Sequence, residues 1–204
     1  RLLVICADPL DAVRLGQEIP WFSPELGVRS LPDWETLPYD VLSPQEDIVS
    51  ERLETLYRMT SGTKGLDVVI ASAVTAAQRM APVAYVGANT FFFRPGDTLS
   101  VEGLRSNLAA AGYAGVKQVL AAGEFAVRGS IIDVIPMGSD RPFRLDLFDD
   151  EIESIRWFDV ETQRSMEAVN EIRLLPGHEF PVTPEAVTGF RQRWRTRFAG
   201  DPGK

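Results

Sequence analysis

The chain has few of the residues that several classes of function require. Its one cysteine, Cys6, lies in an apolar run, which excludes an internal disulfide framework and indicates a core residue in a protein of the reducing cytoplasm. Its one histidine, His178, excludes paired-histidine zinc sites and argues against a Ser-His-Asp triad. No apolar run approaches the roughly 20 residues that span a bilayer, so we expect neither a membrane span nor a secretory leader.

Positive charge is also scarce. The formal net charge is −8, from 21 Lys and Arg against 29 Asp and Glu, which argues against general nucleic-acid binding. The densest basic cluster lies near the end of the sequence, around Trp194, and we interpret it as the solvated face of a terminal helix. Its members are Arg191, Arg193, Arg195 and Arg197.

A phosphate-binding loop is missing as well. Such a loop places glycines and a Lys-Ser/Thr pair between a first strand and its helix, but here that position reads Ala7-Asp8-Pro9-Leu10. A carboxylate repels phosphate and a proline removes a donor. The stretch SGTKG at residues 61–65 precedes a strand and is a turn. We therefore expect no nucleotide hydrolysis and no bound cofactor.

The first part of the chain alternates strands with helices, which predicts a parallel sheet in an α/β unit. The continuous apolar run at 2–7 and the segment 67–72 indicate buried strands, and residues 27–31 can supply another strand between them. Asp8-Pro9 is a helix start, predicted to continue to about Ile19. Ser43-Pro44-Gln45-Glu46 is interpreted as a capping box, and a short helix is expected over 73–80.

After Ala81-Pro82 the pattern changes to an α+β unit with a mainly antiparallel sheet. Residues 85–93 are strand-like, and Ser100 caps a helix that ends near Gly112. Period-two alternation predicts further strands at 115–120, 130–135, 141–148, 151–159 and 171–175. A last helix is expected over 184–198. The predicted parts are therefore 1–84, 85–176 and 177–204.

One face of the predicted sheet has an unusual composition. In the strand FRLDLF, the residues Phe143, Leu145 and Leu147 share the core face, while Arg144, Asp146 and Phe148 face outward. We expect Arg144 and Asp146 to pair, and Arg128 to join this face, followed by Gly129 at a bulge or a close backbone approach.

Arginine beside an aromatic side chain is typical of protein-protein hot spots, so this face is a candidate protein-binding surface. The alternative is a cross-strand salt bridge with Phe148 covered by the neighbouring unit.

A second alternative is a Mg²⁺-dependent nuclease built on Asp146, Asp149 and Glu151. Strand alternation sends neighbouring side chains to opposite faces, and Asp149-Asp150 falls at a turn, where Asp is favoured for local backbone hydrogen bonds. Both observations argue against convergence of these carboxylates on one ion.

Several motifs resemble one bacterial family. LPDWETLPYD at 31–40, followed by Ser43-Pro44 and Asp47-Ile48, closely resembles the N-terminal module of the transcription-repair coupling factors. FAVRG at 125–129, RLDLFDDEI at 144–152 and LLP at 174–176 continue the resemblance, which covers nearly the whole chain. The second half is also similar to the corresponding domain of the repair protein UvrB.

The resemblance implies a fold and a function. The fold is a degenerate helicase-like (RecA-like) domain without its phosphate loop, with an inserted α+β domain that resembles the UvrA-binding domain of UvrB. The function is non-catalytic recruitment of UvrA in nucleotide excision repair, with UvrA contacts at Arg128, Arg144 and Phe148. Glu124 and Asp146 would orient the arginines.

In full-length family members, further partners are implied: RNA polymerase, double-stranded DNA moved by an ATP-driven translocase, and a C-terminal domain that masks this surface. A weak DNA or nucleotide affinity, as a helicase relic, stays an alternative. Within LPDWETLPYD, we expect Trp34, Leu37, Pro38 and Tyr39 to form a packed loop that braces the helix after Ser43.

Overall fold

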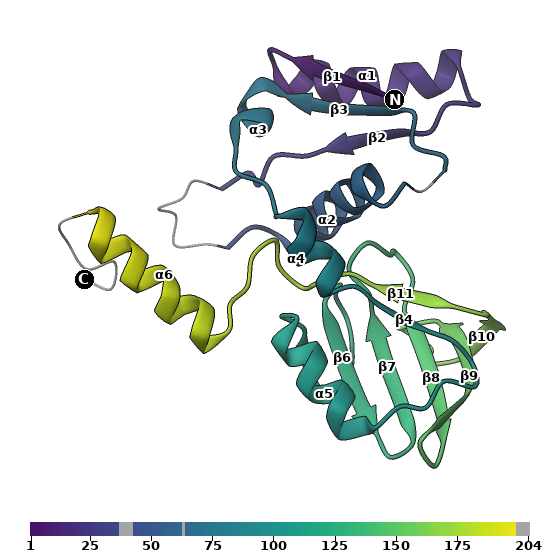
Figure 1. Cartoon of the computed structure of the whole chain (residues 1–204). Helices are drawn as coiled ribbons and strands as arrows, with labels where there is room; N and C mark the ends of the chain where they lie inside the picture. The colour runs from purple at the N-terminus through teal and green to yellow at the C-terminus, as the bar shows by residue number, and fades with distance from the viewer. Residues whose placement is uncertain (37–42, 63, 199–204) are drawn as a thin grey trace.

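The computed structural model describes residues 1–36, 43–62 and 64–198, which form two units built on different sheets (Figure 1). The first unit contains β1 (Leu2–Cys6), β2 (Val28–Leu31) and β3 (Val68–Ser72), in the spatial order β1-β3-β2. Both pairings are parallel, with Val68 opposite Leu2 and Val28. The predicted parallel α/β unit is confirmed.

Two helices cover this sheet. Helix α1 (Pro9–Phe22) begins as predicted, because the Asp8 side chain accepts a hydrogen bond from the Leu10 backbone nitrogen at 2.7 Å. It continues through Pro20, three residues beyond the predicted end. Cys6 is buried in the core beneath α1, and a second small core lies against helix α2 (Glu46–Thr60).

The predicted capping box at α2 is wrong. The N-cap is Gln45, whose backbone is extended (ψ 139°) and whose side chain makes no cap hydrogen bond. Because the chain is still extended at Gln45, Ser43 lies ahead of the helix. Farther along α2, Leu53 belongs to the large core of the second unit, so α2 packs against both units.

The connection between the units also differs from the prediction. Helix α3 (Ala73–Ala77) is followed by α4 (Val83–Ala88), where a strand was predicted over 85–93, and only β4 (Phe91–Phe93) remains extended. Val86 of α4 is buried in the core of the second unit. Burial of this residue overrides the β-propensity of the Tyr-Val pair.

The second unit is built on a six-stranded sheet in the order β10-β9-β8-β7-β6-β5. All its pairings are antiparallel except that of β5 with β6. Its strands are β5 (Ala114–Gly115), β6 (Glu124–Arg128), β7 (Ile131–Ile135), β8 (Phe143–Phe148), β9 (Glu151–Phe158) and β10 (Ser165–Ala168).

The sheet differs from the prediction at its edges. The strand predicted over 115–120 is reduced to two residues, and β10 was not predicted. The strand predicted over 171–175 is β11 (Ile172–Leu174), which pairs with β4 in a separate two-stranded sheet.

Helix α5 (Val101–Ala110) shares one core with the six-stranded sheet. Its first turn is capped by Ser100, as predicted, and it contributes Leu104 and Leu108 to that core. Because side chains alternate along the strands, residues of opposite parity on β6, β7 and β8 lie on the other face, away from this core.

Helix α6 (Pro184–Arg197) projects from the two units and buries none of its residues (Figure 1). Its N-cap is Thr183, whose side chain accepts a hydrogen bond from the Ala186 backbone nitrogen, and the predicted terminal helix is confirmed. In the part of the chain that the structure describes, no helix is both long and apolar enough to traverse a lipid bilayer.

Candidate protein-binding site

The candidate site lies on the face of β6, β7 and β8 that points away from α5, called here the outer face. On β8, Leu145 and Leu147 are buried, as the alternation predicts. Phe148, at the end of the strand, is 71% exposed. The neighbouring unit therefore does not cover this ring, so that half of the alternative is wrong, whereas its cross-strand salt bridge is present between Arg144 and Asp133.

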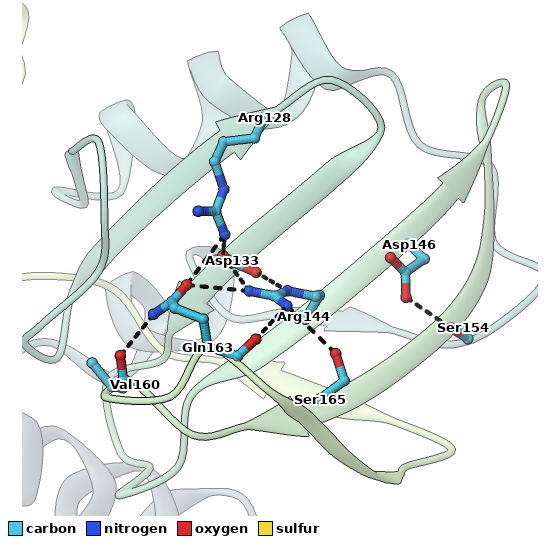
Figure 2. Close-up of polar contacts among 8 residues, drawn as sticks. All are labelled: Arg128, Asp133, Arg144, Asp146, Ser154, Val160, Gln163 and Ser165. Carbon is cyan, nitrogen blue, oxygen red and sulfur yellow. Dashed lines mark hydrogen bonds and ion pairs between the residues drawn. The ribbon is translucent and has the colours of Figure 1, made fainter.

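A buried carboxylate organises the arginines of this face. Asp133 of β7 is only 2% exposed, and its neighbour across the β7–β8 pairing is Arg144. Arg144 donates from Nε to Oδ1 of Asp133 at 2.6 Å and from Nη2 to Oδ2 at 3.0 Å. Arg128 donates from its own Nη2 to the same Oδ2. Figure 2 shows both guanidinium groups converging on Asp133, and we call these three residues the arginine cluster.

A turn after β9 completes the cluster. Gln163, in a left-handed conformation (φ 59°), places its side-chain oxygen 3.4 Å from Nη2 of both arginines. Its backbone carbonyl accepts a hydrogen bond from Arg144 Nη1 at 3.1 Å. The Asp159 carboxylate accepts hydrogen bonds from the backbone and hydroxyl of Thr162, which hold this turn and lower the pKa of Asp159.

Arg144 is consequently more covered than the sequence suggested. Its side chain is 11% exposed, and its guanidinium lies 4.5 Å from the ring centre of Phe158. The hydrogen bond to Asp133 raises the pKa of Arg144, burial opposes this, and the charges of Asp133 and Asp146 add to the rise. Arg128 is 45% exposed, so Arg128 and Phe148 are the accessible members of the predicted set.

The two residues expected to orient the arginines have other partners. Asp146 accepts a hydrogen bond from the Ser154 hydroxyl at 3.2 Å, while Arg144 pairs with Asp133 instead. Glu124 accepts hydrogen bonds from the backbone nitrogens of Leu120 and Ala121 and so holds the turn before β6. The expected pairing of Arg144 with Asp146 is thus replaced by one across strands, because Asp133 lies directly opposite Arg144.

Asp133 was not among the predicted site residues, although the sequence carries a signal for it. Asp133 is the one charged residue in the apolar run IIDVI, and a buried carboxylate needs partners. Gln163 had no comparable signal, since its role depends on the turn that carries it. Gly129, with φ 63°, turns the chain between β6 and β7, so neither the expected bulge nor a close approach is found there.

The acidic residues of the nuclease alternative do not converge. Asp149 occupies a turn with φ 52°, and Asp146 is bound to Ser154. Across residues 1–36, 43–62 and 64–198, no group of three or more His, Cys, Asp or Glu side chains could hold a metal ion. The arrangement at this end of β8 therefore offers no support for metal-dependent cleavage.

The LPDWETLPYD motif contributes to the junction between the units. The Trp34 indole nitrogen donates to Glu179 at 2.9 Å, and Arg52 of α2 lies over the Trp34 ring. Trp34 thus contacts α2, as expected. Leu37, Pro38 and Tyr39 lie outside the described residues.

Comparisons with known proteins show what the second unit and the whole chain are similar to. Residues 91–180 match the family model of the UvrB interaction domain. The chain is 45% identical over 97% of its length to the transcription-repair-coupling factor of Escherichia coli (strain K12). It is 45% identical over 96% to that of Haemophilus influenzae, and 32% identical over 97% to that of Staphylococcus aureus (strain USA300).

The chain is homologous to a segment of the transcription-repair-coupling factors. The resemblance inferred from its motifs is confirmed, and residues 91–180 match the UvrB interaction domain family. The chain spans 17% of the length of each of these relatives. Arg128, Asp133, Arg144 and Phe148 all fall within the matched residues.

Proposed function

We propose that this chain is a non-catalytic binding module that captures UvrA through the outer face, with Phe148 and Arg128 as contacts and Arg144 behind them. The observation that carries the proposal is the exposed Phe148 ring, on the same face as an arginine cluster fixed by a buried carboxylate. The match to the UvrB interaction domain and the similarity to transcription-repair-coupling factors support UvrA as the partner.

The energetics favour a partner for this ring. At 71% exposed, Phe148 gains little from the chain's own core. Covering an aromatic side chain and Arg128 in a partner's pocket stabilises a complex by roughly 2 kcal/mol or more per hot-spot residue. The strand that carries Phe148 is anchored in the core by Leu145 and Leu147, which are buried on its other face.

In the longer relatives, this module would act in recruitment. Other parts would recognise stalled RNA polymerase and act on double-stranded DNA with ATP, and the outer face would then capture UvrA. UvrB, with a similar surface, would compete for UvrA, and the relatives' own C-terminal domain would cover the face until it is needed.

Within this scheme the three parts are 1–84, 85–176 and 177–204. We take the first as a degenerate RecA-like domain. Its α1 N-terminus, where a phosphate loop would bind phosphate, is capped by the Asp8 carboxylate. Weak DNA or nucleotide affinity stays a separate prediction, checked by a salt-dependent gel shift.

The test is titration of the chain against purified UvrA by calorimetry. Phe148→Ala is expected to weaken binding by about 2 kcal/mol, or roughly 30-fold in Kd, with an unchanged thermal unfolding curve. Arg128→Ala should act in the same direction. Arg144→Ala is a poorer probe because it also removes the bidentate partner of Asp133.

The matched control is Phe22→Ala on α1, a phenylalanine that is also largely exposed (80%) and lies outside residues 91–180. It should leave the Kd unchanged. Wild-type affinity in both Phe148→Ala and Arg128→Ala would show that UvrA binds elsewhere or not at all.

A further inference from the structure

The two arginines of the arginine cluster differ in how Asp133 binds them and in how exposed they are. Asp133 is buried and engages both guanidinium groups, Arg144 through two oxygens and Arg128 through one. Arg144 is covered by Phe158 and by the Gln163 turn, whereas Arg128 is half exposed. Only one of the two arginines is therefore well placed to contact a partner.

We propose that Asp133, assisted by Gln163, is a positioning residue for the binding site: it fixes the Arg128 side chain in its docking conformation before UvrA arrives. This inference rests on the proposed function and names residues that act through Arg128 without touching the partner. Arg144 is the rigid support, because it locks the Asp133 carboxylate with two hydrogen bonds.

Charge explains why a carboxylate is needed at this point. Arg128 and Arg144 donate from their Nη2 atoms to the same oxygen, so the two cations would repel each other without it. Arg156 of β9 lies directly opposite Arg144 and adds a third positive charge, while Asp146 is the other carboxylate whose charge acts on Arg144. Neutralising Asp133 would release Arg128 from this face.

Gln163 adds a second restraint. Its side-chain oxygen lies 3.4 Å from both Nη2 atoms, and its amide donates to the Val160 carbonyl at 2.7 Å, which fixes the direction of that oxygen. An arginine that is already ordered loses less rotamer freedom on docking, which is worth up to about tenfold in Kd.

The experiment is a double-mutant cycle on UvrA affinity with Asp133→Asn and Arg128→Ala. Asp133→Asn alone is expected to raise Kd about tenfold, because Arg128 is no longer held. In the Arg128→Ala background the same change should raise Kd less than about twofold, because the side chain on which it acts is gone. A purely structural role would give the same loss in both backgrounds, and that additive result would overturn the proposal.

Two further variants sharpen the test. Asp146→Asn removes a carboxylate of the same face that is bound to Ser154, and it should change Kd less than Asp133→Asn; an equal loss would show that only the charge of the face matters. Gln163→Gly suits the left-handed backbone and keeps the carbonyl that Arg144 binds, so it should raise Kd about threefold. If thermal unfolding shows that Asp133→Asn is misfolded, the test uses Gln163→Gly by itself. An unchanged Kd of Gln163→Gly for UvrA would then overturn the proposal.

The outcomes separate this inference from the proposed function. If Phe148→Ala and Arg128→Ala weaken UvrA binding while Asp133→Asn and Gln163→Gly do not, the positioning role is wrong and the binding site stands. If none of these variants changes Kd, the proposed function fails first.

Discussion

Replacing Arg52 by methionine tests what holds the two units together. The Arg52 side chain is fully buried and donates to Glu179, from Nε and also from Nη2 at 3.3 Å, and to the Pro32 carbonyl from Nη1. It also lies 4.9 Å from the ring centre of Trp34, which itself donates to Glu179. One buried ion pair thus joins α2 of the first unit to the segment that follows the second unit.

The magnitude follows from what the substitution leaves behind. Methionine can fill the aliphatic part of the site, but the Glu179 carboxylate stays buried with the Trp34 indole as its remaining donor among these contacts. Breaking a buried pair from one side costs about 3–5 kcal/mol, a large share of the 5–15 kcal/mol that stabilises a typical domain. The double variant Arg52→Met/Glu179→Leu removes both charges and should be more stable than Arg52→Met alone.

Urea unfolding, followed by circular dichroism, measures these differences. The control is Arg14→Met on α1, whose side chain is 63% exposed and pairs with Asp11 and Glu18 at the surface; it should change stability by less than about 0.5 kcal/mol. A loss below about 1 kcal/mol for Arg52→Met would refute the reasoning, since the pair would then be hydrated in solution. The reasoning would also be refuted if the loss in unfolding free energy of the double variant equalled the sum of the losses of Arg52→Met and Glu179→Leu.

Two further stability predictions come from buried polar and backbone contacts. Tyr113→Phe removes the buried hydroxyl that donates to the Leu175 carbonyl and accepts from the Met137 backbone nitrogen, and it should destabilise the chain by about 1–3 kcal/mol in urea unfolding. Burial raises the pKa of Tyr113, so on raising the pH this phenol ionises in the unfolded chain before it ionises in the folded one. The stability of the wild type should therefore fall as pH rises above about 10, and the fall should be smaller in Tyr113→Phe. Gly27→Ala places a Cβ 2.0 Å from the Gly65 carbonyl oxygen and should lower stability by about 1–3 kcal/mol. The control is Gly87→Ala, whose Cβ would have open space around it and should not lower stability. Thermal unfolding of the two variants measures the difference.

Local patterns were enough to predict much of the fold. Asp8 before Pro9 and Ser100 before its helix are caps that depend on a few neighbouring residues, and both were predicted correctly. The alternation in β8 placed Leu145 and Leu147 in the core and left Phe148 outside it. These features depend on contacts within one strand or one turn, which the sequence order specifies directly.

Features that depend on distant contacts were not predictable in the same way. Helix α4 forms where β-propensity favoured a strand, because Val86 packs into a core built from residues far along the chain. Arg144 was expected to be exposed and paired with Asp146. Its actual partner lies on another strand, and its cover comes from the Gln163 turn, neither of which is specified by spacing within β8.

Within the described part of the chain, two buried carboxylates each pair with two arginines, and the two clusters differ in how exposed those arginines are. The buried Glu54 of α2 is paired with Arg58 and with Arg173 of β11, much as Asp133 is paired with Arg128 and Arg144. Both arginines at Glu54 are about one-quarter exposed (26% and 23%), and Arg173 lies over the Tyr57 ring, so that cluster serves to join the units.

At Asp133 the exposure is divided unequally: 11% for Arg144 and 45% for Arg128. Buried ion pairs add little net stability but fix geometry. Asp133 binds Arg144 through both carboxylate oxygens and Arg128 through one, and Arg128 keeps the more exposed side chain. This difference in exposure is why we propose Arg128 as the docking contact and Arg144 as its support.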